Sequence, residues 1–237
     1  AGQINPSNPQ AFDLVEKVFS EAKKLFNSSV YHLGGDEIKE SCYENETVTV
    51  TVKQYMEKAR TLFEGKRAVY WNDAFYYREN DTLQYWDQSS LFPSTFNQKK
   101  KTASFIYSSY EDLYLDCGWG NLFGDKNTWC AGPKKIKNIY AIDLKGICKD
   151  SCDRLLGSEA VLFGEMATDG SVDWKLWPRA SALAERLWSN KANATMGRDE
   201  WVRLAAQNRR MRARGLGASR IWKEACDRNF LVLKPEK

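Results

Sequence analysis

The sequence predicts an α/β fold that corresponds to the C-terminal part of a (β/α)₈ barrel. Short apolar segments alternate with helical segments or long connections, which is typical of parallel βα units. We count five such strands along the chain. Five units neither close an eight-stranded barrel nor form a regular doubly wound sheet, so we expect about three further strands to come from a separate upstream chain.

Residue periodicity places the individual elements. Residues 9–26 carry apolar side chains at helical spacing, with Ser7 or Asn8 as the N-cap and Pro9 in the first turn. The other predicted helices cover residues 47–63, 174–188 and 199–214, and the predicted strands cover residues 30–34, 68–71, 82–86, 103–108 and 159–163.

One long connection interrupts this pattern. Residues 110–156 are rich in Gly, Asp and Cys and show no periodicity. Loops of this length inside a compact domain are functional or covalently stapled. We therefore expect residues 1–237 to form one portion of a single barrel, with this stapled loop at about residues 110–156 and C-terminal helices.

The composition argues against several classes of protein. Apolar residues make up 43% of the chain and aromatic residues 13%, enough for a core and an aromatic binding cleft. The net charge of +4 is spread out, and its densest spot, residues 99–101, is typical of a solvated loop rather than a nucleic-acid site. No apolar run approaches the roughly 18 residues that a membrane span needs.

Other features indicate an exported, processed protein. The six cysteines do not form a paired C-x-x-C zinc pattern, which favours disulfides. The polar N-terminus is not a signal peptide, so we expect it to be produced by cleavage of a precursor. Four residues head Asn-X-Ser/Thr glycosylation triplets: Asn27, Asn45, Asn80 and Asn193.

The segment YHLGGDE, residues 31–37, carries two adjacent acids at the end of a predicted strand. A regular strand would point Asp36 and Glu37 to opposite faces. Gly34 and Gly35 permit backbone dihedrals that other residues avoid, so both acids can face one pocket. In a (β/α)₈ barrel the chemistry lies at this end of the strands.

Two other interpretations of the acid pair remain open from these residues alone. An acid pair after a strand also serves as the N-cap and first-turn acid of the next helix. A metal site built from His32, Asp36 and Glu37 is the second alternative, but the spacing fits no familiar ligand set and the chain has no second histidine.

The segment resembles the His-X-Gly-Gly-Asp-Glu signature of the family 20 glycoside hydrolases, the β-N-acetylhexosaminidases. Nearly the whole chain agrees with that family in order and spacing. The family's acid pair ends its fourth strand, which leaves five strands here. The further matching segments are VYWNDAFY (69–76), LQYWDQS (83–89), LYLDCGWG (113–120), LGSEAVLFGE (156–165) and LWPRASALAERLWS (176–189).

The resemblance implies a retaining reaction that the substrate assists, without a metal or a cofactor. The acetamido oxygen of the N-acetylhexosamine attacks its own anomeric carbon and gives an oxazolinium-like intermediate. Glu37 acts as the general acid and then as the base, and Asp36 holds the acetamido N–H. His32 is expected to be structural, hydrogen-bonding beneath the site.

The resemblance also assigns the sugar pocket. Trp71, Trp86 and Tyr114 match aromatic residues around the acetamido group, and Phe163 stands where the family has a third tryptophan. For each tryptophan the alternative is ordinary core packing. Asp116 and Glu165 match carboxylates that bind sugar hydroxyls, and Trp129 matches a tryptophan that stacks the next sugar in some chitin-oligosaccharide-cleaving members.

The resemblance finally bears on partners and covalent links. Cys42 matches a cysteine whose partner lies upstream, so we expect a disulfide to the other chain of the precursor. We also expect a Cys117–Cys130 disulfide and a Cys148–Cys152 disulfide, a dimer of the processed unit, and a secreted or lysosomal location. The rival hypothesis is a carbohydrate-binding receptor on the same scaffold with weakened catalysis, which the change at Phe163 motivates.

Overall fold

The computed structural model describes two compact units of the chain. The first unit comprises residues 1–86, 92–107 and 150–156, and the second comprises residues 87–91, 108–149 and 157–237. Within them the structure describes residues 3–39, 48–99, 101–118, 130, 132–189 and 195–221.

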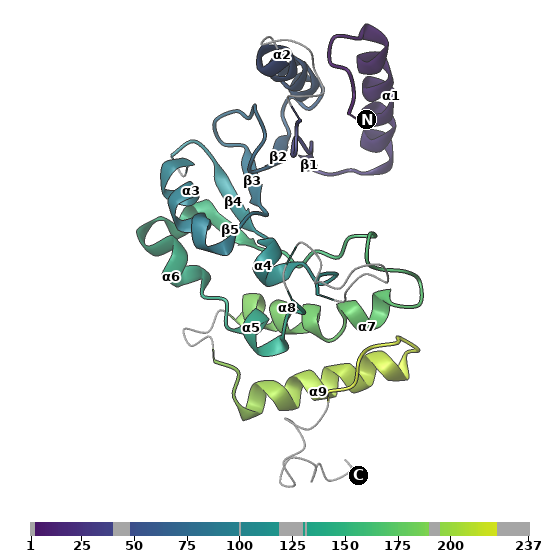
Figure 1. Ribbon diagram of the computed structural model, residues 1–237, viewed down its shortest axis with the longest axis vertical. Coiled ribbons are helices and arrows are strands. Elements are labelled where there is room, and N and C mark those ends of the chain that lie inside the picture. Colours follow the sequence, from purple (N-terminus) through teal and green to yellow (C-terminus); the bar gives the residue numbers. More distant parts are fainter. Residues whose placement is uncertain are drawn as a thin grey trace. The chain divides into compact units, whose positions relative to one another are not determined.

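The described residues form one five-stranded sheet whose strands lie in chain order, as Figure 1 shows. The first three strand pairs are all parallel. Parallel neighbours need a crossover connection, and the helices supply it after the first and third strands. The strands are β1 (Val30–His32), β2 (Arg67–Trp71), β3 (Thr82–Tyr85), β4 (Ser104–Tyr107) and β5 (Leu155–Ser158).

Helices precede, connect and follow these strands (Figure 1). The α-helices are α1 (Pro9–Leu25), α2 (Val48–Thr61), α3 (Phe92–Lys99), α4 (Tyr110–Leu113), α5 (Ile136–Tyr140), α6 (Leu144–Cys148), α7 (Val172–Leu176), α8 (Arg179–Ser189) and α9 (Arg198–Ala213). Two 3₁₀ segments, η2 (Ser89–Leu91) and η3 (Lys149–Arg154), complete the described secondary structure. No helix in the described ranges is long and apolar enough to cross a membrane.

Aromatic side chains form the core of the first unit. Phe92 of α3 is fully buried and packs edge-on against Tyr85 of β3 and Tyr107 of β4, with ring centroids 4.8 and 4.9 Å apart. Phe96 and Phe105 extend the cluster. Edge-to-face aromatic pairs stabilise a core beyond the area that they bury, so α3 is held firmly on β3 and β4.

The second unit has a smaller core around its C-terminal helices. Tyr140 of α5, Ala182 of α8 and Trp201 and Leu204 of α9 are buried together. The carboxylate of Glu200 accepts a hydrogen bond from the Gly197 N–H at the start of α9. This capping satisfies a donor that the helix leaves without an internal partner.

Most of the sequence-predicted elements are confirmed. The helix predicted over residues 9–26 is α1, and Asn8 rather than Ser7 caps it by accepting the Gln10 N–H at 3.0 Å. The helices predicted over 47–63 and 199–214 are α2 and α9. The first four predicted strands are β1 to β4, although β1 ends at His32 rather than Gly34.

The predicted strand over residues 159–163 is wrong in position. The fifth strand is β5, and Val161 forms only an isolated parallel bridge to Tyr114. Tyr114 follows α4 directly, and the chain turns again when the Cys117 N–H bonds the Tyr114 carbonyl. The partner segment is therefore extended over too few residues to support a longer ladder.

Two further predictions need correction. The helix predicted over residues 174–188 is split into α7 and α8 by Pro178, which has no N–H to continue a helix. The connection over residues 110–156 is not structureless, because it contains α4, α5 and α6. These helices are short, with too few turns to produce a readable periodicity.

A buried ion pair ties α2 to the start of β3. The Arg60 guanidinium lies 3.1 Å from the Asp81 carboxylate, and both side chains are more than nine-tenths buried. Arg60 also donates to the carbonyls of Phe63 and Lys66, and Asp81 accepts the backbone N–H of Arg78. Buried charges are tolerated when they are paired and hydrogen-bonded in this way.

We expect Asp81→Ala to lower the free energy of unfolding by about 3–5 kcal/mol, because it leaves the Arg60 charge buried without its partner. The control is Glu64→Ala, which removes the exposed partner of Arg78 and should change stability little. Chemical denaturation of both variants measures the difference. Equal losses in the two variants would contradict the structural role of the buried pair.

Candidate active site

The chain leaves strand geometry directly after β1. Gly34 and Gly35 adopt φ values of +67° and +93°, and Glu37 adopts +50°. A Cβ on Gly35 would lie 2.6 Å from the flexible end of the Met56 side chain and 3.0 Å from the Ala74 Cβ, so the positive φ is the main reason for glycine there. For Glu37, a left-handed backbone costs on the order of 1–2 kcal/mol, which the surrounding contacts must offset.

Asp36 lies in a mostly apolar environment. It lines a cavity of about 280 Å³ together with Phe19, Leu33 and Met56. Burial is the main cause that raises the pKa of Asp36 above its ordinary value of 3.8. A hydrogen bond from its own backbone N–H lowers this pKa, the negative charge of Asp73 raises it, and the charge of His32 lowers it. Glu37 is exposed and is not among the residues that line this cavity.

Asp73 connects the acid pair to the aromatic residues. Its Oδ2 accepts the backbone N–H of Glu37 at 2.9 Å, and its Oδ1 accepts the indole N–H of Trp86 at 2.9 Å. Asp73 was not among the site residues predicted from the sequence. The available signal was a carboxylate two positions after a strand end, in the segment Trp71-Asn72-Asp73.

His32 has a structural contact with the turn that follows it. Its Nδ1 accepts the Gly34 N–H at 3.0 Å, and its ring centroid lies 5.0 Å from that of Trp71. Both contacts keep the imidazole beside the turn that carries the acids. The structural role of His32 stays a prediction.

The two strand-end tryptophans are partly buried rather than core residues. Trp71 ends β2 and donates its backbone N–H to the Gly34 carbonyl at 3.1 Å. Trp86 follows β3, and the Asn72 side-chain oxygen accepts its backbone N–H at 2.9 Å. Both tryptophans thus belong to the same edge of the sheet as the acid pair.

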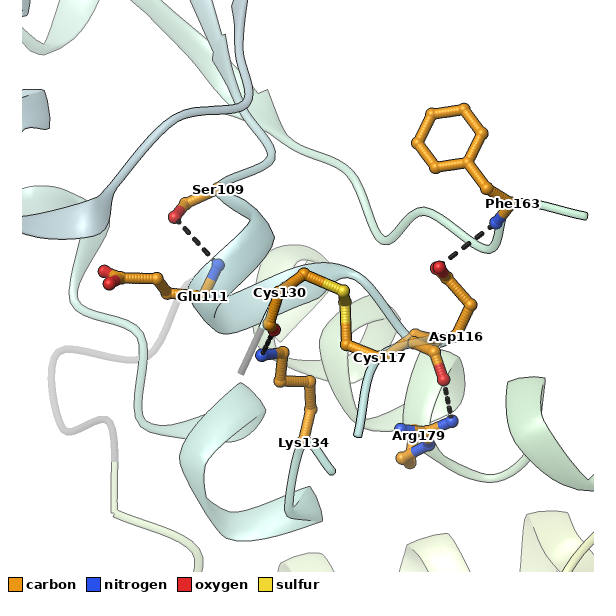
Figure 2. The surroundings of a disulfide bond; sticks show 9 residues. Ser109, Glu111, Asp116, Cys117, Cys130, Lys134, Phe163 and Arg179 are labelled. Atoms are coloured by element: carbon orange, nitrogen blue, oxygen red, sulfur yellow. Dashed lines mark hydrogen bonds between the residues drawn. A yellow bond between two sulfur atoms is a disulfide. The ribbon is translucent and has the colours of Figure 1, made fainter. Parts of the chain in front are cut away.

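A second group of predicted site residues lies in the second unit. The buried Tyr114 ring packs edge-on against Phe163, with centroids 5.2 Å apart. Figure 2 shows the Asp116 carboxylate pointing at the backbone N–H of Phe163. Its Oδ1 accepts a hydrogen bond from this N–H, with 3.2 Å between the oxygen and the nitrogen. Phe163 itself keeps 37% of its surface exposed, enough for a ligand contact.

The electrostatics of Asp116 are set mainly by burial. Burial raises its pKa, the backbone N–H groups of Phe163 and Asp116 lower it, the charge of Glu165 raises it and that of Lys175 lowers it. Glu165 is exposed, beyond the Val161 bridge. The charge of Glu165 therefore acts on the Asp116 carboxyl group.

Two buried cationic side chains bind the backbone near the second group of site residues. Arg179 donates to the backbone carbonyls of Leu115 and Lys175, and burial lowers its pKa to about 10. Lys175 is also buried and donates to the Met166 carbonyl. Neither residue was predicted from the sequence as part of the site, because cationic side chains on helices ordinarily lie in solvent.

The Cys117–Cys130 disulfide is present as expected, with Cα atoms 5.5 Å apart (Figure 2). Cys148 and Cys152 are both disulfide-bonded. Asp116, Cys117 and Cys130 bring ligand-type atoms within 4.8 Å of one another. Because the two sulfurs are bonded to each other, they are not thiolates that could hold a metal.

A known family matches most of this chain. Residues 1–191 match the model of the glycosyl hydrolase family 20 catalytic domain. The chain belongs to glycoside hydrolase family 20. The predicted α/β fold class and the resemblance to this family are thereby confirmed.

Two curated relatives of this family 20 chain, one from an insect and one from human, cover almost all of it. The chitooligosaccharidolytic beta-N-acetylglucosaminidase of Ostrinia furnacalis is 27% identical, over 96% of this chain and 43% of that protein. The beta-hexosaminidase subunit beta of Homo sapiens is 26% identical, over 95% of this chain and 42% of that protein. The chain therefore spans less than half the length of these relatives.

Solved structures of family 20 enzymes share the fold. The N-acetyl-beta-hexosaminidase of Streptomyces plicatus, in complex with Thio-NAglucal, gives a TM-score of 0.71 at 24% identity, over 91% of this chain and 44% of that one. The beta-N-acetylhexosaminidase of Streptomyces coelicolor gives a TM-score of 0.72 at 23% identity, over 92% of this chain and 44% of that one.

The structure thus describes most predicted site residues of this family 20 chain in two groups. Asp36, Glu37, Trp71 and Trp86 belong to the first unit, and Tyr114, Asp116, Phe163 and Glu165 to the second. The glycosylation candidates Asn27 and Asn80 are exposed. Predictions that fall outside the described residues are those for Cys42, Asn45, Trp129 and Asn193.

We expect Asp36→Asn to change the pH dependence of stability. The folded state holds the Asp36 proton more tightly than the unfolded state, so the wild type loses stability as pH rises from about 3.8 through the higher folded pKa. Asparagine cannot ionise. The melting temperature of the variant relative to the wild type should therefore rise across this window and then level off.

Thermal melts between acid and neutral pH measure this difference. Asp13→Asn, at an exposed position on α1, is the matched control for the loss of a carboxylate. Parallel curves for Asp36→Asn and the wild type would contradict the burial of the Asp36 charge.

Proposed function

We propose that this chain carries the catalytic acids of an exo-acting β-N-acetylhexosaminidase. The enzyme would remove terminal N-acetylglucosamine or N-acetylgalactosamine from oligosaccharides or glycoconjugates. The observation that carries the proposal is the Asp36–Glu37 pair, held outside strand geometry at the end of β1 by the turn at Gly34 and Gly35. Membership in family 20 and the names of the relatives support it.

The proposed reaction retains configuration and uses the substrate as nucleophile. The acetamido oxygen attacks the anomeric carbon and the glycosidic bond breaks, giving an oxazolinium intermediate. Glu37 donates a proton to the leaving oxygen and then takes one from the water that opens the ring. Because the nucleophile is tethered to the sugar, little orientational entropy is lost on reaction.

Asp36 would accept the acetamido N–H and balance the positive charge that develops on the ring. Its apolar surroundings strengthen such an interaction, because water competes less there. The charge of the neighbouring Asp73 adds to the rise in the pKa of Asp36. The exposed Glu37 remains accessible to a leaving group and to water.

The sugar pocket would be formed by the residues that match the family's aromatic and carboxylate positions. Trp71, Trp86, Tyr114 and Phe163 would enclose the acetamido group and the sugar ring, since aromatic faces suit the apolar faces of sugars. The carboxylates of Asp116 and Glu165 would accept hydrogen bonds from sugar hydroxyl groups. Trp129 would stack a second sugar, in keeping with relatives named as chitooligosaccharidolytic enzymes.

We further propose that an upstream segment of the same precursor completes the barrel. The chain spans less than half of its relatives' length. Apolar side chains on α1 are exposed in a way that an added layer would cover: Leu14 is 62% exposed, Val18 57% and Leu25 75%. The assembled unit would form the expected dimer.

The proposed compartment is the secretory route, with a secreted or lysosomal destination. Disulfides form in oxidising compartments, and this chain has a Cys117–Cys130 bond and two further bonded cysteines. The exposed sequons at Asn27 and Asn80 agree with glycosylation during export. Proteolytic processing of the precursor is part of the same proposal.

We expect Cys42 to be linked to the upstream chain. Peptide mass analysis of the native protein under reducing and non-reducing conditions would then yield a Cys42 peptide joined to a sequence absent from residues 1–237. A free Cys42, or one paired within this chain, would reject the link. The Cys117–Cys130 peptide serves as an internal control because it is joined within the chain.

We expect Glu37→Gln in the assembled protein to lower kcat by about 10²–10⁴-fold, because it removes the general acid and base. The loss should be greater for N,N′-diacetylchitobiose than for 4-nitrophenyl N-acetyl-β-glucosaminide, whose leaving group needs less protonation. Release of N-acetylglucosamine and of 4-nitrophenol measures both rates. Asp13→Asn is the control variant.

Turnover that survives Glu37→Gln would contradict this assignment. A wild-type protein that binds N-acetylglucosamine without turnover would instead support the carbohydrate receptor, for which Phe163 is the motivating change. The retention of both acids in an ordered turn favours the enzyme over the receptor.

A further inference from the structure

The general acid Glu37 stands on an unusual backbone. Its φ of +50° is one that a residue with a side chain rarely adopts. Two hydrogen bonds hold its peptide groups: the N–H donates to Asp73 Oδ2 at 2.9 Å, and the carbonyl accepts from the Gln3 side chain at 2.7 Å. The direction of the Glu37 side chain therefore depends on contacts outside its own segment.

Asp73 makes a second bond of the same kind. Its Oδ1 accepts the indole N–H of Trp86 at 2.9 Å. β2 lies between β1 and β3 in the sheet, and Asp73 follows β2. One carboxylate thus joins the segment after β1 to the segment after β3, using one oxygen for each.

An ordinary structural role does not account for this arrangement. Asp73 is not a helix cap, because residues 72–81 contain no helix. It is exposed, and exposed charges contribute little to stability. Its two bonds to N–H groups are nevertheless charge-assisted, and both go to residues of the proposed site.

We propose that Asp73 is a positioning residue that fixes Glu37 relative to the pocket wall at Trp86. The proposal rests on the proposed glycosidase function. Asp73 takes no part in proton transfer itself. It holds the Glu37 backbone, so that the carboxyl group meets the glycosidic oxygen of a sugar whose ring is placed by Trp86.

The chemical consequence is specific to proton delivery. A general acid must lie within hydrogen-bond reach of the oxygen that it protonates. A sugar leaving group depends on that proton, whereas 4-nitrophenolate departs with little assistance. Loss of positioning should therefore affect the disaccharide far more than the aryl substrate, and kcat more than KM.

The test uses Asp73→Asn in the assembled protein. Asparagine keeps one acceptor oxygen and replaces the other with an NH₂ group, so one of the two N–H donors loses its partner. We expect kcat for N,N′-diacetylchitobiose to fall about 10- to 100-fold, as a displacement near 1 Å can produce. With 4-nitrophenyl N-acetyl-β-glucosaminide we expect a fall of only about threefold or less.

A double-mutant cycle tests the link between the two segments. Trp86→Phe removes the indole N–H and leaves an aromatic ring. If Asp73 joins Glu37 to Trp86, the effects of Asp73→Asn and Trp86→Phe on kcat should not multiply, because either change breaks the same connection. Fully multiplicative effects would overturn the bridging role.

Hydrogen exchange provides a readout that does not depend on activity. Asp73→Asn should speed exchange in the peptide that contains Glu37, whereas the control Asp13→Asn should not. If the wild type shows no turnover but exchange responds as expected, the proposed function fails while the positioning contact stands. If the wild type is active and Asp73→Asn slows both substrates equally without changing exchange, the positioning proposal is overturned.

Discussion

The parallel backbone ladder of β1, β2 and β3 is the constraint on which the candidate site depends. It continues past the strands: the Leu33 N–H bonds the Val69 carbonyl, the Trp71 N–H bonds the Gly34 carbonyl, and the Asn72 N–H bonds the Gln84 carbonyl. Because the strands are parallel, their carboxyl ends lie at one edge. The side chains that follow β1, β2 and β3 therefore lie at the same edge, although these three segments are far apart in the sequence.

Burial is distributed unevenly over the acids at this edge. Asp36 faces a mostly apolar cavity while Glu37 is exposed, although they are neighbours in sequence. The turn at Gly34 and Gly35 is what allows this difference. Two carboxylates with different surroundings can take different roles in one reaction, one holding charge and the other exchanging protons with substrate and water.

Helical periodicity was sufficient to predict α1, α2 and α9, and short apolar runs were sufficient to predict the first four strands, of which β2, β3 and β4 bury most of their side chains. An apolar run failed to predict the strand position at residues 159–163, where pairing depends on how far Tyr114 and its neighbours stay extended. Asp73 was missed for a related reason. Its importance lies in two partners from other segments, Glu37 and Trp86, and no local pattern encodes such a contact.

The position of β1 also has a consequence for handling the protein. β1 is the terminal strand in the described sheet and has a strand neighbour on one side only. An open strand edge is a template for pairing with another molecule, and neither proline nor lysine blocks Val30–His32. A preparation of this chain alone therefore invites self-association through that edge, and co-expression with a covering segment is the rational route to a well-behaved sample.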